Sequence, residues 1–450
     1  MIRDAVRRYT ELLASPQGRL TETRDILLNG MREADLDFGG RVLSPYLRPH
    51  FVDSDQWQMV TGVCEGIWDC IRIVGNAVQT DSQMMDDLRL TEGERKLISV
   101  DPGFKEISAT SRLDSFLSDD SYQFVELNAE CPAGIAYADV VSEIHLTTPV
   151  MKDFAEAYDV RPLLSRDKML EVLLRCYQEF AGNNAPKPLI AIVDWNDVPT
   201  QAEFRLFQRY FTSQGYETII ADPRELEFTN GKLRHNGKVI DVVYRRLLTN
   251  EFLEKLDETR ALLDAYQASA VCVVNSFRSK YVHKKMLFGI LTDERYARYF
   301  SEAQQNLIKA HVPWTRGVVE RRTKYYGEDV DLCDLIRRNR DNLVLKPNDE
   351  YGGKGIFIGW ESDDAKWDEA IQIALQGDYL VQERVQTGHE EFPYFDSQGN
   401  ISFVEQLVDL DPLLYFGKVG GAFTRLSTSS LANVTSGAGM TPTFLIAGKH

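Results

Sequence analysis

Four short apolar runs in the middle of the chain constrain its fold more than any other feature. They lie at residues 189–194, 218–221, 239–244 and 271–274. Runs of this kind are typical of buried parallel strands. A helical pattern from Phe204 to Phe211 separates the first two runs, and another at residues 253–268 precedes the last. A polar stretch at 227–238 contains two Asn-Gly pairs and predicts a hairpin. The alternation predicts a small three-layer α/β unit with a parallel sheet.

The rest of the chain mixes both kinds of pattern, so the expected fold class is α+β combined with α/β. Apolar spacing predicts a mostly helical stretch at residues 1–95 and a further helical stretch at 145–182. The remaining predicted helices lie near 284–294 and 364–376, and the remaining strands near 124–128, 343–347, 355–359, 379–385 and 401–408. No internal repeat or low-complexity linker separates these elements. We therefore divide the chain at 1–95, 96–165, 166–275 and 276–450, and expect the four regions to pack closely.

Charge and cysteine content restrict the classes of partner. The formal net charge is −17, from 68 acidic and 51 basic residues. Nucleic acids and anionic membrane surfaces attract basic proteins, so we expect neither as a partner. The six cysteines form no CxxC pair, which is typical of reduced thiols in the cytoplasm. The N-terminal stretch is polar, and no run reaches the ~18–20 apolar residues that cross a bilayer. We therefore expect a cytoplasmic protein.

One glycine-rich segment, at residues 344–358, is suited to phosphate binding. It is expected to form a strand, a loop and a second strand, with Lys346 at the end of the first strand. Glycines let backbone N–H groups approach phosphate oxygens, and a lysine adds positive charge to the same oxygens. The loop residues concerned are Gly352, Gly353, Lys354 and Gly355. A tight hairpin with a solvent-facing lysine is the alternative interpretation.

A second set of polar residues has the composition of a magnesium site. It consists of Arg112-x-Asp114 followed by Glu126-x-Asn128. Side chains two apart on a strand project from the same face, so Glu126 and Asn128 lie together. Mg²⁺ prefers one or two carboxylates together with phosphate oxygens, and an arginine binds a phosphoryl group in bidentate fashion. The alternative is a surface Arg–Asp pair beside an exposed strand. Tyr244-Arg245-Arg246, at a strand end, either faces a substrate cleft or is ion-paired.

Together these segments resemble the ATP-grasp superfamily, in which a nucleotide lies between two α+β subdomains. In that superfamily the Glu-x-Asn strand normally follows the glycine loop, whereas here it precedes the loop by more than 200 residues. Residues 425–427 and 433–439 resemble the segment that usually comes before the Glu-x-Asn strand. This order resembles a circular permutation, and the chain is similar over residues 100–445 to the synthetase region of the glutathionylspermidine synthase family. No amidase region is found.

The resemblance implies a circularly permuted ATP-grasp fold and a role for each matching residue. Region 96–165 would be the permuted metal-binding part, 166–275 a pre-ATP-grasp-like substrate-side domain, and 276–450 the nucleotide-binding subdomains. Asp114, Glu126 and Asn128 would hold Mg²⁺, and Arg112 would stabilise the transferring phosphoryl group. Residues implied in binding ATP are Lys285 (with Lys284 as its rival), Lys346, Gly352, Gly353, Lys354, Gly355, Gln382, Glu383, Val385, Arg425 and Asn433. The segment 382–385 would be the hinge that reads adenine.

The implied activity is ATP- and Mg²⁺-dependent ligation of a carboxylate to an amine through an acyl phosphate. The enzyme would act mainly by positioning the substrates and neutralising charge. Two other hypotheses are an ATP-grasp kinase and a catalytically silent nucleotide-binding scaffold. The sequence identifies neither substrate more closely than an amino acid, a peptide or a polyamine.

Overall fold

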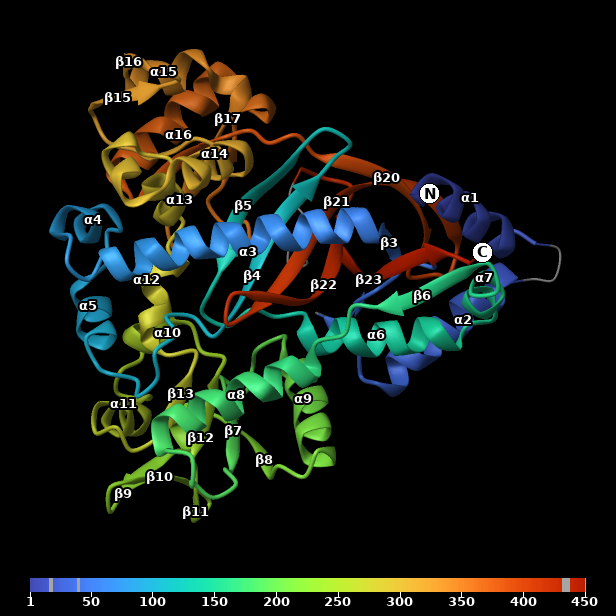
Figure 1. Ribbon diagram of the computed structural model, residues 1–450, viewed down its shortest axis with the longest axis horizontal. Coiled ribbons are helices and arrows are strands. Elements are labelled where there is room, and N and C mark those ends of the chain that lie inside the picture. Colours follow the sequence, from blue (N-terminus) through green and yellow to red (C-terminus); the bar gives the residue numbers. More distant parts are fainter. Residues whose placement is uncertain (16–18, 39–40, 351, 431–437, 450) are drawn as a thin grey trace.

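The computed structural model describes residues 1–15, 19–38, 41–350, 352–430 and 438–449. A large central sheet lies between two smaller bodies, and the long helix α3 (Ser54–Ala77) crosses it (Figure 1). One smaller body contains α14 to α16 and the strands around β17, and the other contains the helices and strands from α8 to β13. No helix in these described ranges is both long and apolar enough to span a bilayer.

The large sheet joins segments from both ends of the chain. Its main path runs β3-β23-β22-β21-β4-β5, with β6 on β23 and β20 on β21. The strands are β3 (His50–Asp53), β4 (Thr110–Leu117), β5 (Tyr122–Asn128), β6 (Tyr158–Pro162), β20 (Gly388–Phe395), β21 (Ile401–Tyr415), β22 (Lys418–Ser427) and β23 (Gly439–Gly448). β4 pairs antiparallel with β21. Residues 110–117 therefore lie beside 401–415, although the two segments are far apart in the sequence.

The two faces of this sheet bury different side chains because successive residues of a strand point in opposite directions. On β21, Leu410 and Leu414 pack in the cluster that contains α3. Leu413 and Tyr415 pack in a second cluster with α6 (Ile135–Thr147). The odd-numbered side chains earlier in β21 project from the same face as Leu413, and that part of the face carries charged residues.

The first region is mostly helical, as predicted, but it is not separate from the sheet. Its helices are α1 (Ile2–Leu13), α2 (Arg19–Glu33), α3, α4 (Ser82–Asp87) and α5 (Glu92–Ile98). Asp53, the last residue of β3, caps α3 by accepting from Gln56 N. The expectation of continuous helix over 145–182 is wrong, because β6 separates α7 (Pro149–Phe154) from α8 (Arg166–Ala181). β6 has little apolar pattern of its own and pairs antiparallel with β23.

The small α/β unit has the parallel sheet that the four apolar runs predicted. Its order is β13-β12-β7-β8, and all of its pairs are parallel. The strands are β7 (Ile190–Val193), β8 (Thr218–Ala221), β12 (Val242–Arg245) and β13 (Cys272–Val274), with α9 (Gln201–Ser213) after β7. A separate small sheet contains β9 (Glu227–Thr229), β10 (Lys232–His235) and β11 (Lys238–Val239). The single helix expected at 253–268 is instead α10 (Thr249–Glu254) and α11 (Arg260–Gln267).

The third body is built on an antiparallel sheet of order β14-β19-β17-β18. These strands are β14 (Thr315–Gly317), β17 (Leu343–Pro347), β18 (Phe357–Ile358) and β19 (Tyr379–Glu383). The neighbouring elements are α12 (Lys280–His283), α13 (Met286–Leu291), α14 (Glu302–His311), β15 (Arg322–Tyr325), β16 (Glu328–Asp331), α15 (Leu332–Arg338) and α16 (Asp364–Gln376). Trp367 of α16 packs on Leu345 and Val381 in the core of this body.

Candidate active site

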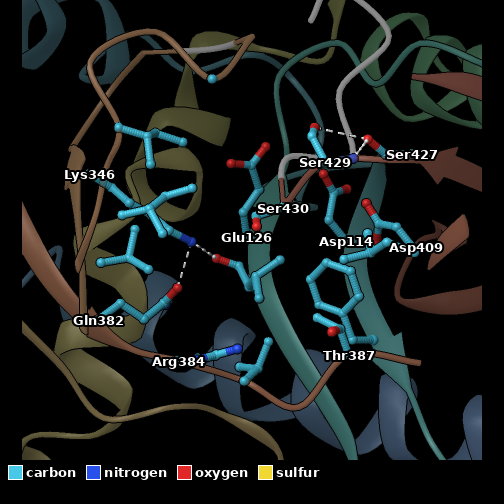
Figure 2. Close-up of a pocket in the computed structure, with 18 of the residues that line it drawn as sticks. Asp114, Glu126, Lys346, Gln382, Arg384, Thr387, Asp409, Ser427, Ser429 and Ser430 are labelled. Carbon is cyan, nitrogen blue, oxygen red and sulfur yellow. Dashed lines mark hydrogen bonds between the residues drawn. The ribbon is translucent and has the colours of Figure 1, made fainter. Parts of the chain in front are cut away.

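A cavity of about 410 Å³ lies between the large sheet and the β17–β19 sheet. Its lining includes these residues singled out in the sequence: Asp114, Glu126, Lys285, Lys346, Gly352, Gly353, Lys354, Gln382, Glu383, Val385 and Arg425. Figure 2 shows Lys346 and Gln382 on one side, with Asp114 and Asp409 across the cavity from them. Segments far apart in the sequence therefore converge on one space.

The first side is the large-sheet wall, which we define as the charged face of β4, β5, β21 and β22. Strand register places Asp114 opposite Glu126 and Asp409 opposite Arg425. Arg112 holds both oxygens of Asp114, with Nε–Oδ1 and Nη2–Oδ2 distances of 2.8 and 3.1 Å. The Asn128 amide nitrogen donates to Asp114 at 3.1 Å and to Glu126 at 3.0 Å. The Arg-x-Asp and Glu-x-Asn motifs thus form one hydrogen-bonded unit.

Arg425 connects this unit to two carboxylates that sequence reasoning did not assign. Its Nη2 lies 2.5 Å from Asp114 Oδ2 and 2.6 Å from Asp409 Oδ2. The same nitrogen donates to Asp411 Oδ1 at 3.2 Å. One oxygen from each of the three aspartates lies within 4.8 Å of the others. Arg425 donates to all three aspartates, so its guanidinium already supplies positive charge where their oxygens converge.

The aspartates of this wall have different proton affinities. Burial raises the pKa of Asp114, but Arg112 and Arg425 outweigh it, and the net pKa falls below the usual range. For Asp409, burial prevails over Arg425 and raises the pKa to about 7. Burial also raises the pKa of Asp411 well above its usual value. Two guanidiniums therefore do not compensate all the charge that three ionised aspartates would carry.

The donor chemistry of this wall fits a magnesium ion at Glu126. Magnesium is a hard cation that prefers oxygen ligands. The Glu126 side chain is 25% exposed, lines the cavity, and approaches Asp114 through the shared Asn128 amide. Burial raises the Glu126 pKa, but Lys285, Lys346 and Arg425 together outweigh it and lower the pKa, so this carboxylate is ionised at neutral pH. Asp114 would contribute a second carboxylate, although both of its oxygens already accept from arginine.

The opposite side is the lysine wall, which we define as the cavity-facing side chains of β17, β18 and β19. Lys346 Nζ donates to Gln382 Oε1 at 2.7 Å and to the Val125 carbonyl at 3.5 Å (Figure 2). Burial lowers the pKa of Lys346 to about 8, while Glu126 acts in the opposite direction. Gln382 also donates to Thr315 Oγ1 at 3.2 Å, which fixes its side chain. Lys346 is thus a largely desolvated cation whose position is fixed by its hydrogen bonds.

The two candidate lysines before α13 occupy different environments. Lys285 lines the cavity, lies 3.2 Å from Glu126 Oε2 and donates to the Glu350 carbonyl at 2.7 Å. Lys284 is 3% exposed and forms ion pairs with Asp349 at 2.9 Å and Glu94 at 3.0 Å. The geometry therefore favours Lys285 as the residue that faces a ligand.

The glycine-rich segment connects two strands as predicted, and these strands, β17 and β18, pair antiparallel. Gly352 and Gly353 line the cavity with φ values of +74° and +76°, a region that side chains disfavour. Gly355 is different, since a Cβ there would lie 2.7 Å from the Tyr379 hydroxyl. Gly355 does not line the cavity, so the role that the structure shows for it is close packing against Tyr379. Tyr351 and Asn433 lie outside the described residues.

An apolar part of the cavity lies beside the segment 382–385. Apolar side chains of the lining include Phe116, Val344, Ile358, Trp360, Val385 and Leu407. The Arg384 guanidinium lies 4.2 Å from the centre of the Trp360 ring. Glu383 accepts from the Tyr325 and Tyr326 hydroxyls at 2.7 and 3.0 Å. This part of the cavity can therefore bind a flat apolar ring that lies beside the backbone groups at the strand end.

A second cavity of about 270 Å³ adjoins the first. The linings share Glu126, Lys285, Glu350, Gly352 and Arg425. Arg112 was expected at the transferring phosphoryl group and Asn128 at the magnesium ion, and both line this second cavity and not the first. Its far side comes from the small α/β unit and includes Arg246, which pairs with Glu203 at 3.2 Å. Arg245 pairs with Glu130 at 3.3 Å and is fully buried.

Comparison with known proteins identifies the family. The family model described as circularly permuted ATP-grasp type 2 matches residues 115–426. A Frankia casuarinae protein, named as a candidate glutamate–cysteine ligase 2-2, is 23% identical over 345 residues. That alignment covers 73% of this chain, and the chain spans only 37% of the relative's length.

A solved structure supports the same fold. The glutathione synthetase-like effector of Globodera pallida, in its apo form, superposes with a TM-score of 0.60 at 13% identity. The superposition covers 97% of this chain and 99% of that one. Since the family model spans more than half of the sequence, the chain belongs to the circularly permuted ATP-grasp type 2 family.

Proposed function

We propose that this protein is an ATP- and Mg²⁺-dependent carboxylate–amine ligase. The observation that carries the proposal is the shared wall between the two cavities. One cavity combines an apolar part with Lys346 and two lining glycines, which suits a nucleoside triphosphate. The other opens at Glu126, Lys285 and Arg425, where the terminal phosphate would lie. A ligase needs this adjacency because its second substrate must reach that phosphate.

The reaction divides into two steps whose atoms balance. A carboxylate oxygen attacks the γ-phosphorus of ATP, the bond to the β-phosphate oxygen breaks, and ADP and an acyl phosphate form. The amine nitrogen then attacks the acyl carbon, phosphate leaves, and the nitrogen loses a proton. Charge neutralisation and positioning supply most of the acceleration in such phosphoryl transfers.

The residues of the chain have separable roles in this scheme. Lys346 and the Gly352–Gly353 backbone bind phosphates already present in the ground state. Arg112, fixed by its bidentate contact with Asp114, faces the second cavity and stabilises charge on the transferring group. Glu126, with Asp114 and Asn128, would hold magnesium. When bound, the metal neutralises phosphate charge and orients the phosphate oxygens.

The substrate assignment goes further than the family. The name of the Frankia relative suggests an amino acid or a thiol-bearing amino acid as substrate. The sequence resemblance to the glutathionylspermidine synthase family suggests a peptide acid and a polyamine. We propose amino acids, small peptides and polyamines as the classes to screen, and the cytoplasm as the location.

The proposal is tested by ADP release with a panel of paired acids and amines, followed by mass analysis of the product. An amide product supports a ligase, a stable phosphorylated product indicates a kinase, and ATP binding without turnover indicates a scaffold.

Glu126→Gln and Asn128→Ala should each abolish most ADP release, because each weakens a ligand for the metal.

Asp120→Asn is the matched control for these two variants. It removes a charge from the exposed turn of the same β4–β5 hairpin, away from both cavities. It should retain full activity. Normal turnover in Glu126→Gln would contradict the assignment of the site.

A further inference from the structure

The second cavity contains acidic groups that the phosphoryl chemistry does not use. It lies at the carboxyl ends of β7 and β12, which are neighbours in the order β13-β12-β7-β8. The chain adds β8 on one side of β7 and then β12 on the other, so the direction of strand addition reverses there. In open α/β sheets, the crevice at such a reversal is where ligands bind.

Asp194 follows β7 directly and faces this crevice. It is 6% exposed, and its Oδ1 accepts from the Trp195 backbone N–H at 2.9 Å. Its Oδ2 has no hydrogen-bond partner within the described ranges. Burial raises the Asp194 pKa to about 7, with Arg246 lowering it and Glu251 raising it. Burying a carboxylate costs free energy unless hydrogen-bond donors satisfy both of its oxygens.

Glu251, in the first turn of α10, lines the same cavity. Burial raises its pKa, and the indole N–H of Trp195 acts in the opposite direction. Lys255 lies one turn further along, but its ammonium sits 4.2 Å from the centre of the Trp195 ring. Lys255 forms no ion pair with Glu251 among the contacts of the described chain. Among the residues that the structure describes, neither carboxylate therefore has a cationic partner within contact distance.

The other cations of this cavity are already engaged. Arg246 donates to the Pro132 carbonyl at 2.8 Å and pairs with Glu203. At the opposite end, Lys285 pairs with Glu126, and Arg112 pairs with Asp114. The cavity therefore has a charge-compensated end at the phosphate site and an acidic end at Asp194.

We propose that Asp194 and Glu251 bind a primary ammonium group on a small substrate, remote from the carboxylate or amine that reacts. The inference rests on the proposed ligase function only for placing the reacting end beside Glu126 and Arg425. A primary ammonium is a compact cation with three donors, which suits two carboxylates on different elements. Its source is either the α-amino group of an amino acid or peptide, or the distal nitrogen of a diamine or polyamine.

Binding of matched probes tests this without requiring turnover. Each pair differs by one ammonium group: L-glutamate with glutarate, and 1,4-diaminobutane with butylamine. Calorimetry on the full chain, with a nonhydrolysable ATP analogue and magnesium present, gives the dissociation constants. One ammonium-bearing probe should bind ~10- to 100-fold more tightly than its partner, the scale of a charge-assisted hydrogen bond. The pair that shows the difference identifies the source of the ammonium.

Asp194→Asn and Glu251→Gln should each reduce that preference about tenfold, with unchanged affinity for the ATP analogue. Glu251 is only partly buried, so its variant provides a test even if Asp194→Asn misfolds. Glu254→Gln removes an exposed charge from the same helix and should retain the full preference. Equal affinities within both pairs, absence of binding included, or a preference unchanged in Glu251→Gln, would overturn the inference. Failure to bind the ATP analogue would count instead against the proposed function.

Discussion

The large-sheet wall holds three aspartates and two arginines in mutual contact, whereas the lysine wall holds one partly buried ammonium whose hydrogen-bond partners are uncharged. In the first wall, the two guanidiniums offset most of the carboxylate charge without any ligand. In the second, desolvation has already lowered the pKa of Lys346 to about 8. The ion pairs of the large-sheet wall thus preorganise it. The positive charge of the lysine wall, in contrast, is fully compensated only when an anion binds.

The largest expected effect comes from breaking the compensation in the large-sheet wall. Arg425→Met leaves Asp114, Asp409 and Asp411 without their common cation. Losing one partner of a buried ionic network destabilises a protein by about 3–5 kcal/mol. Urea unfolding measures the loss. Arg322→Met, an exposed arginine of the β15–β16 hairpin, should change stability by less than about 1 kcal/mol. A similarly small change in Arg425→Met would show that the wall does not depend on that guanidinium.

The next effect separates transition-state stabilisation from ground-state binding. Arg112→Ala should lower single-turnover rates by roughly 10²–10³, because one donor to developing charge is lost. ATP affinity should change little, since Arg112 lines the second cavity and not the first. Lys346→Met should show the reverse pattern, with weaker ATP binding by calorimetry. Near-normal turnover in Arg112→Ala would show that the Arg112–Asp114 contact is only a structural ion pair.

The smallest effect is the pH dependence that the lysine wall adds to ATP binding above pH 8. Phosphate binding needs the ammonium form of Lys346, whose pKa is lowered to about 8 in the free protein. ATP affinity should therefore be fully present below pH 8 and fall as pH rises above it, by up to about tenfold per unit. Lys346→Arg keeps its charge over this range and should lose that slope. Calorimetric titrations from pH 7 to 9.5 compare the two proteins, and identical slopes would contradict the assignment.

Sequence reasoning placed the site residues correctly where the structure is local. Lys346 and the glycines lie within one hairpin, and Glu126 and Asn128 share one face of one strand. The four parallel strands were also recognisable, because a doubly covered strand must be apolar along its whole length. In each case a few consecutive residues contain the whole signal.

The missed features depend on pairing between distant segments. The strand predicted at 401–408 extends to Tyr415, so Asp409 and Asp411 fell outside it. Proline removes a backbone donor and usually ends a central strand, yet Pro412 lies within β21. The available signal was the alternation of apolar and acidic residues from Val408 to Asp411. Likewise, β3 and β6 become strands by pairing with β23, and no local pattern specifies that partner.

The wall shared by the two cavities has a consequence for inhibitor design. Glu126, Lys285 and Arg425 line both spaces, so the ligands that the two cavities would hold lie against the same few side chains. A single molecule that joins an adenosine-phosphate mimic to an amine-bearing fragment would lose overall translational and rotational freedom only once. Its second half would then bind at an effective concentration set by the linker, on the order of millimolar for a short one. Such a bisubstrate compound would exceed the affinity of either fragment and would compete with both substrates at once.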